Sequence, residues 1–275
     1  MDDNFAIFIT THGRPQCLTY HTLRNAGYTG RMFCVVDNED DTVDEYRKNY
    51  GEENVLVFDK YAVSQRVDKL TNEYMKSVVL YSRIACYDFA HRLDVDYFIS
   101  IDDDVTLFKL RMIVDDKLKS IPVTDADAVL GAMLEFFKTT PLYALGIADA
   151  GIYFGGKSGV WSQCIRQSFS VGCFLKTHEP IEFGSVFNED IYTSVNANRE
   201  GKTCFELLDI CQESDSQGTG DSGGMVDFYR THKKVVRSFY TVIAFPDFAT
   251  MNERGDLRFN RLCMTPKIIS CKYKK

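Results

Sequence analysis

The sequence lacks several features that mark other classes of protein. No run of about 18 apolar residues occurs in its 275 residues, so no membrane-spanning helix is expected. Its nine cysteines form no C-x-x-C pair, which argues against structural zinc and for free thiols in a reducing compartment. The first residues, MDDNFAIF, carry acids where a signal peptide carries bases. These absences together predict a cytoplasmic protein.

Excess positive charge is also missing. The formal net charge is −7, which argues against broad, non-specific binding to nucleic acid. Two short segments, residues 229–237 and 267–275, are basic, and the second is interpreted as a solvated terminus. There is no internal repeat and no linker rich in Pro, Gly or Ser, so residues 1–275 are expected to form one domain.

The first hundred residues alternate between strand and helix patterns. Strands are predicted at 5–11, 31–37, 54–58 and 95–102, and helices at 14–27, 42–51 and 63–93. This alternation predicts an α/β fold with a mostly parallel sheet flanked by helices, in which ligands bind beyond the carboxyl ends of the strands. The second half is less regular. Strands are predicted at 127–134, 150–156 and 237–245, helices at 158–169 and 188–201, and a glycine-rich loop at 212–224.

Three adjacent aspartates, Asp102, Asp103 and Asp104, follow the apolar stretch YFISI. In an extended chain Asp102 and Asp104 face one way and Asp103 the other. Two carboxylates on one side of a strand end suit a hard divalent cation, Mn²⁺ or Mg²⁺, which would relieve their repulsion. The alternative is a helix start, because acids are favourable before a helix and residues 105–118 were open to a helical interpretation.

These segments resemble a known family. ITTHGRP, YSRIACYDFA, YFISIDDDV, AGIYFGG and NEDIYTS are similar to elements of the nucleotide-sugar glycosyltransferases of the GT-A fold. GGMVDFYRTHKKVVRSFYTVIAFPDFA is similar to the C-terminal element of the TET/JBP-associated glycosyltransferases, which include base J glucosyltransferase and phage relatives that act on hydroxymethylated bases in DNA. The resemblance implies a Rossmann-like nucleotide-sugar-binding half, residues 1–108, and a more irregular acceptor-side half, residues 109–275.

The resemblance implies roles for individual residues. The donor-binding set is Thr10, Thr11, Arg14, Asp37, Arg83, Asp103 and Lys233. Hydroxyls and guanidinium groups at strand ends suit a nucleotide. Three members have plainer interpretations: Thr11 as a helix cap, Asp37 as a turn residue, and Arg83 as part of a structural ion pair.

Catalytic and metal-binding roles are implied in the second half. Both inverting and retaining transfers occur on this fold, and the sequence does not choose between them. An inverting transfer needs a carboxylate to take the acceptor proton, and the resemblance points to Asp190, with Glu189 as the alternative. His232 is the expected third metal ligand beside Asp102 and Asp104. The plainer interpretations are acids placed at a helix start and an exposed histidine in a basic patch.

The sequence therefore predicts a metal-dependent glycosyltransferase that uses a nucleotide sugar, with UDP-sugar as the expected donor. A hydroxymethylated pyrimidine in phage DNA is the first choice of acceptor, which would place the enzyme in the host cytoplasm. A protein or small-molecule acceptor, a nucleotidyltransferase, and a binding module without catalysis are the alternatives. Residues 218–224 are expected to form either a lid over the donor or a plain loop.

Overall fold

The computed structural model describes residues 2–115, 117–150, 165–167, 172–215 and 231–259. Strands of the central sheet are β1 (Phe5–Thr10), β2 (Arg31–Asp37), β3 (Val55–Phe58), β4 (Tyr97–Asp102), β5 (Val105–Val114), β6 (Lys117–Pro122), β7 (Ala144–Asp149), β8 (Ile165–Gln167), β9 (Cys173–Lys176) and β10 (Cys204–Ser214). They form one ten-stranded sheet with the order β3-β2-β1-β4-β9-β7-β10-β5-β6, and β8 pairs with β10 off this path.

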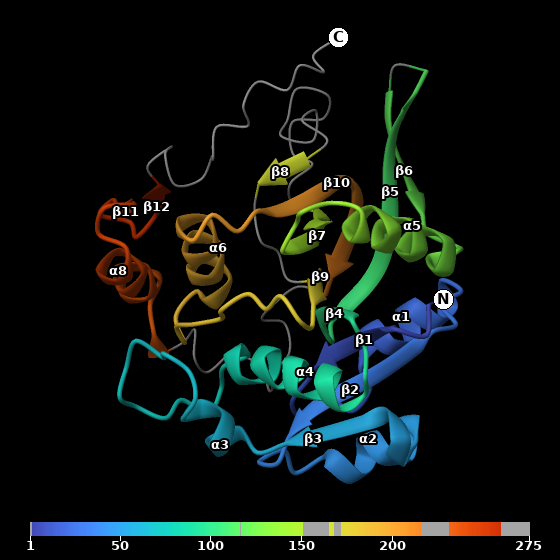
Figure 1. Ribbon diagram of the computed structural model, residues 1–275, viewed down its shortest axis with the longest axis horizontal. Coiled ribbons are helices and arrows are strands. Elements are labelled where there is room, and N and C mark those ends of the chain that lie inside the picture. The colour runs from blue at the N-terminus through green and yellow to red at the C-terminus, as the bar shows by residue number, and fades with distance from the viewer. Residues whose placement is uncertain (1, 116, 151–164, 168–171, 216–230, 260–275) are drawn as a thin grey trace.

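Helices cover both faces of this sheet (Figure 1). They are α1 (Leu18–Asn25), α2 (Val43–Tyr50), α3 (Lys60–Ser64), α4 (Leu80–Arg92), α5 (Ala126–Lys138), α6 (Glu189–Arg199) and α8 (Lys234–Ala244). A short 3-10 helix, Glu52–Asn54, precedes β3, and a two-stranded sheet of β11 (Ala249–Met251) and β12 (Leu257–Phe259) lies beyond α8. None of the helices in the described part of the chain is both long and apolar enough to cross a membrane.

The alternation of side chains along β1 explains why two cores form. Phe5, Ile7 and Ile9 belong to one core cluster together with side chains of α1, α2 and α5. Ala6 and Phe8 point the other way and pack with α4. Successive residues of a strand face opposite sides of a sheet, so a continuous apolar run is what a strand buried on both faces requires.

Parallel pairing dominates only the first part of the sheet. β1 pairs in parallel with β2 and β4, and β2 with β3. Beyond β4 the pairing is mainly antiparallel, through β9, β7, β10, β5 and β6. The α/β class is thus confirmed, with a regular parallel part and a more irregular remainder.

Most elements of the first part agree with the sequence prediction, but the long helix at 63–93 does not. The structure has the short helix α3 and then α4, and residues 65–79 between them form no helix. The reason is tertiary backbone pairing, because the carbonyl oxygens of Asp68 and Lys69 accept hydrogen bonds from the amides of Ser185 and Val186. Leu70, with φ of 56°, also interrupts a helical path.

Two predicted strands are helices in the structure. Residues 127–134 lie in α5, which begins where the Asp125 carboxylate accepts a hydrogen bond from the Ala128 amide at 3.0 Å. Residues 237–244 lie in α8, whose buried face consists of the small polar residues Ser238 and Thr241, three positions apart. The short apolar run of the first segment and the β-branched and aromatic residues of the second favour strands, but both segments form helices, and of the two only α5 has a side-chain cap.

Other segments of the second half also need correction. The stretch 105–114, open to a helical interpretation, is strand β5, so the three aspartates do not begin a helix. Within the helix predicted at 158–169, Ile165–Gln167 is a strand paired with β10. The strand predicted at 150–156 falls, apart from its first residue, outside the described residues. The predicted loop begins inside β10, which extends to Ser214, and residues 216–224 lie outside the described part.

Candidate functional site

The sheet topology creates one natural ligand position. The chain passes from β1 through α1 to β2, and through α2 to β3, always moving in one direction across the sheet. It then crosses back, through α3 and α4, to place β4 on the other side of β1. Helices on either side of this reversal pack on opposite faces, and in sheets of this kind ligands bind beyond the carboxyl ends of the strands at the reversal, here β1 and β4. Thr10 and Asp102 are register partners there.

Asp102 is held from two sides. Its Oδ1 atom accepts a hydrogen bond from the Thr10 hydroxyl at 3.0 Å and lies 3.2 Å from Nη2 of Arg83. Arg83 comes from α4 and is 1% exposed, whereas the Asp102 side chain remains 31% exposed. A fully buried guanidinium therefore fixes a carboxylate that still reaches solvent.

Asp103 has a different environment. It is buried, and its two oxygens accept hydrogen bonds from the Thr11 hydroxyl at 2.6 Å and from Nη1 of Arg14 at 2.8 Å. Burial raises the Asp103 pKa, and Arg14 and Thr11 only partly oppose this effect. The Tyr46 hydroxyl completes the group by contacting Thr11 and accepting a bond from the Arg14 amide. Thr11 is not a helix cap, because α1 begins seven residues later.

Asp104 follows in the turn before β5 and is 20% exposed. Burial first, and then repulsion from Asp102 and Asp103, raises its pKa to about 6. Arg14 Nη1, at 4.0 Å, provides partial compensation. Asp102 and Asp104 thus offer accessible oxygen ligands in a place where negative charge is in excess. Mg²⁺ and Mn²⁺ accept such ligands and commonly take the remainder from phosphate oxygens and water, so the donor set fits such an ion.

The other end of Arg83 reaches α6. Nε of Arg83 lies 3.6 Å from Oε1 of Glu189, which is buried in the first turn of that helix. Burial and the neighbouring Asp190 raise the Glu189 pKa to about 7, although Arg83 opposes this shift. The Asp190 pKa is also raised, mainly by burial. Arg83 therefore joins the aspartate cluster to Glu189, the alternative base and the neighbour of Asp190, and among the described residues its Nη1 atom has no hydrogen-bond partner.

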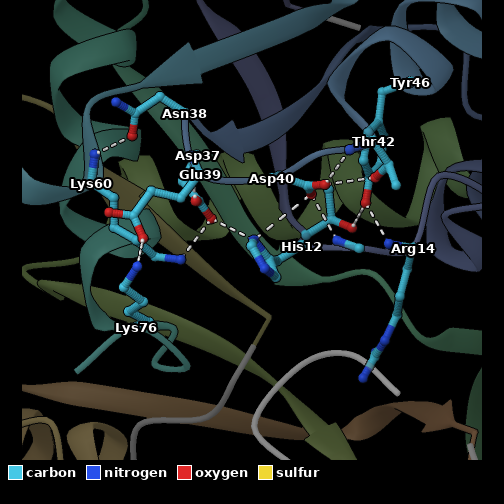
Figure 2. Close-up of polar contacts among 12 residues, drawn as sticks. His12, Arg14, Asp37, Asn38, Glu39, Asp40, Thr42, Tyr46, Lys60 and Lys76 are labelled. Atoms are coloured by element: carbon cyan, nitrogen blue, oxygen red, sulfur yellow. Dashed lines mark hydrogen bonds and ion pairs between the residues drawn. The ribbon is translucent and has the colours of Figure 1, made fainter. Parts of the chain in front are cut away.

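A second cluster forms where β1, β2 and β3 end (Figure 2). Asp37, at the end of β2, is buried and lies 2.9 Å from Nζ of the equally buried Lys60. The same oxygen lies 2.7 Å from Nδ1 of His12, whose ring is half-exposed. Burial disfavours the Asp37 charge, but the bonds from His12 and Lys60 outweigh it and lower the pKa of Asp37. The bond to Asp37 raises the pKa of His12.

Asp40 links this cluster to the loop after β1. Its Oδ2 atom accepts a 2.7 Å hydrogen bond from the Gly13 amide and lies 3.7 Å from the His12 ring. The other oxygen caps the following turn through Thr42. Sequence reasoning missed Asp40, Lys60 and Tyr46. A lysine directly after the strand VLVFD was the available signal, since the carboxyl ends of neighbouring parallel strands meet at one edge.

His232 and Lys233 lie at the start of α8. The His232 ring packs edge-on against Phe187 at a centroid distance of 5.3 Å, two residues before Glu189. Lys233 is the exposed N-cap residue of α8. Among the residues that the structure describes, no group of three or more His, Cys, Asp or Glu side chains is arranged to hold a metal ion. A metal-binding role for His232 therefore stays a prediction.

Comparison with solved structures shows the fold. The glucosyl-3-phosphoglycerate synthase of Mycobacterium tuberculosis, solved with Mn²⁺, UDP and phosphoglyceric acid, superposes with a TM-score of 0.50 at 9% identity, covering 87% of this chain and 77% of that one. A protein of Desulfovibrio desulfuricans G20 described as a nucleotide-diphospho-sugar transferase gives 0.45 at 10% identity, covering 89% and 95%. The fold is that of the GT-A glycosyltransferases.

The family follows from the sequence comparison. Residues 5–223 match the model of the TET-Associated Glycosyltransferase family, so the chain belongs to that family and is a nucleotide-sugar-dependent glycosyltransferase. No curated protein sequence matches the chain significantly. The resemblance noted from the strand ends and the three aspartates is thereby confirmed.

Proposed function

We propose that this glycosyltransferase moves a sugar from a UDP-sugar to the hydroxyl of a hydroxymethylated pyrimidine in DNA, in a reaction that depends on Mn²⁺ or Mg²⁺. The observation that carries the proposal is the span of Arg83, which contacts Asp102 at 3.2 Å and Glu189 at 3.6 Å. A buried cation between two acidic groups fits a reaction with a diphosphate at one end and a proton acceptor at the other.

On the donor side, Asp102 and Asp104 would hold the metal ion, which neutralises the charge that develops on the departing diphosphate. Arg14 and Arg83 are the nearest cations, and Nη1 of Arg83 has the free donor capacity that a phosphate oxygen needs. The second cluster, around Asp37, lies at the adjacent strand ends, where we place the nucleoside. UDP as the nucleotide is supported by the mycobacterial synthase, which was solved with UDP and Mn²⁺.

On the acceptor side, Asp190 would act as the general base in an inverting transfer. The acceptor oxygen attacks the anomeric carbon, the bond to the diphosphate breaks, and the acceptor proton passes to the carboxylate. Glu189 is already paired with Arg83 and more deeply buried, so we assign it to positioning and keep it as the alternative base. A raised pKa suits a base, because a more basic carboxylate accepts the proton more readily.

The test compares UDP release with sugar transfer to three acceptors: hydroxymethylated DNA, a protein digest, and free hydroxymethyl nucleosides. Asp190→Asn should lower kcat on the true acceptor by about 10²–10⁴-fold without changing donor-induced thermal stabilisation. If the sugar is transferred only to the protein digest or only to free nucleosides, the assignment as a glycosyltransferase stands and the proposal of DNA as the acceptor is wrong. Full activity of Asp190→Asn together with loss in Glu189→Gln would move the base to Glu189.

A further inference from the structure

Strands β5 and β6 form a two-stranded ribbon that projects from the body of the protein (Figure 1). β10 pairs with β5 only as far as Leu110, so Arg111–Val114 and the facing part of β6 have no further strand beside them in the described chain. At about 3.3 Å per residue, these four residues extend about 13 Å beyond the paired part.

Register divides the side chains of this ribbon between two faces. Directly opposed residues share a face, and the pairs Leu110–Ile121, Met112–Lys119 and Val114–Lys117 define one of them. We call these six residues the outer ribbon face. Leu118, on the opposite face, packs against a small core cluster of β7 and β10. The outer ribbon face is turned away from that small cluster, and at its base Leu110 packs against the main core.

The outer ribbon face combines positive charge with exposed apolar groups. Met112 and Ile121 are 40% and 42% exposed, Lys117 and Lys119 are exposed, and none of the six residues is acidic. This composition is unusual in a chain with a net charge of −7. Among the described residues, the carboxylate paired with this face is that of Asp115 in the turn, 3.8 Å from Lys119 and almost fully exposed, which makes the pair weak, and the sequence places a second acid, Asp116, beside it.

We propose that the outer ribbon face binds duplex DNA, with Lys117 and Lys119 on phosphates and with Met112 and Ile121 against the groove. This inference rests on the DNA acceptor proposed above. A two-stranded ribbon fits a major groove about 12 Å wide, where apolar side chains can contact the thymine methyl group. An enzyme that modifies a base in a duplex must also hold DNA from which that base is extruded.

Charge favours DNA over a second copy of the chain as the occupant. β6 is an edge strand, and two copies paired edge to edge would bring Lys117 and Lys119 of each copy together. Lysine on an edge strand opposes such pairing. The same lysines complement a phosphate backbone, whose neutralisation releases counterions.

The test measures binding of a short fluorescent duplex by anisotropy between about 50 and 200 mM salt. Lys117→Ala/Lys119→Ala should weaken binding roughly tenfold and reduce the salt slope by about 1.8. Met112→Ala/Ile121→Ala should weaken binding without changing that slope. The charge-matched control, Lys48→Ala/Arg92→Ala on α2 and α4, should change neither quantity.

Three outcomes would overturn the proposal: no duplex binding by the wild-type protein, equal losses in the ribbon and control variants, or a dimer that the ribbon substitutions dissociate. Thermal stabilisation by UDP-sugar and donor-dependent UDP release are measured on every variant, and both should equal the wild-type values. A protein that keeps these donor activities but binds no duplex would refute the ribbon's role while leaving the glycosyltransferase assignment intact. If UDP-sugar does not stabilise the wild-type protein against thermal unfolding, the proposed donor site is wrong instead.

Discussion

Replacing Asp104 by asparagine should stabilise the metal-free protein and destabilise the metal-bound protein relative to the wild type. The folded state raises the pKa of Asp104 from 3.8 to about 6. The ionised carboxylate is therefore less favourable in the folded protein than in the unfolded chain, and at neutral pH it destabilises the fold. For an acid with a raised pKa, this destabilisation is complete above the folded-state pKa and disappears as the pH falls below the unfolded value. Asp104→Asn removes the charge and should stabilise the metal-free protein above pH 6.

The magnitude follows from the same pKa. A rise from 3.8 to about 6 corresponds to about 3 kcal/mol, and screening of this partly exposed group halves the figure to about 1.5 kcal/mol. In a chain of this size that is a rise in Tm of about 3–6 °C at pH 7.5, measured by calorimetry with chelator present. At pH 4 the difference should nearly vanish.

Adding Mn²⁺ together with UDP, which contributes the remaining oxygen ligands, should reverse the order of the two proteins. A ligand at about 100 times its Kd stabilises the native state by about 2.7 kcal/mol, and only the wild type keeps both accessible carboxylates. Asp41→Asn, at an exposed position after β2, serves as the control and should behave like the wild type. A lower metal-free Tm for Asp104→Asn, or equal stabilisation of both proteins by Mn²⁺ together with UDP, would refute the reasoning.

Three further changes test the buried charges around the site. Arg83→Met should destabilise the protein by about 3–5 kcal/mol in urea unfolding, because it leaves two acidic groups without their buried cation; an effect below 1 kcal/mol would contradict this. Lys60→Met should lower the free energy of unfolding by a similar amount, because it leaves the buried Asp37 carboxylate without its cation. The double variant Lys60→Met/Asp37→Leu should regain much of that lost stability. The kcat of wild type should rise with pH near 7, as Glu189 ionises, and Glu189→Gln should abolish that step; an unchanged profile would show that Glu189 does not control it.

The sequence identified those parts of the fold that have strong local signals. β1, β2, β3 and β4 are buried apolar runs, and glycine follows α1 and α2, as at Gly51 with its φ of 89°. The strand predictions for the segments of α5 and α8 are wrong, because a short apolar run suits either element and packing decides between them. For α8 the deciding feature is a buried Ser238 that hydrogen-bonds the Gly255 carbonyl, a contact no local pattern reveals.

The site was partly visible in the same way. Asp102 and Asp104 stood out because charges directly after a buried strand need a reason, and Arg83 stood out because arginine is rarely buried alone. Lys60 and Tyr46 did not, because each is a single polar group whose partners come from other strand ends. Long-range contacts of this kind depend on the sheet order, which the sequence alone does not specify.

The two contacts that hold Asp102 also determine its denticity. Thr10 and Arg83 both approach Oδ1, which leaves Oδ2 as the oxygen available to a ligand. A carboxylate engaged in this way binds a cation through one oxygen, so the protein alone supplies only a few of the oxygen ligands that the ion needs. Metal affinity should then be low for the free protein and rise with nucleotide concentration, because the diphosphate contributes the remaining oxygens. Metal and donor would in that case reach the site as one unit.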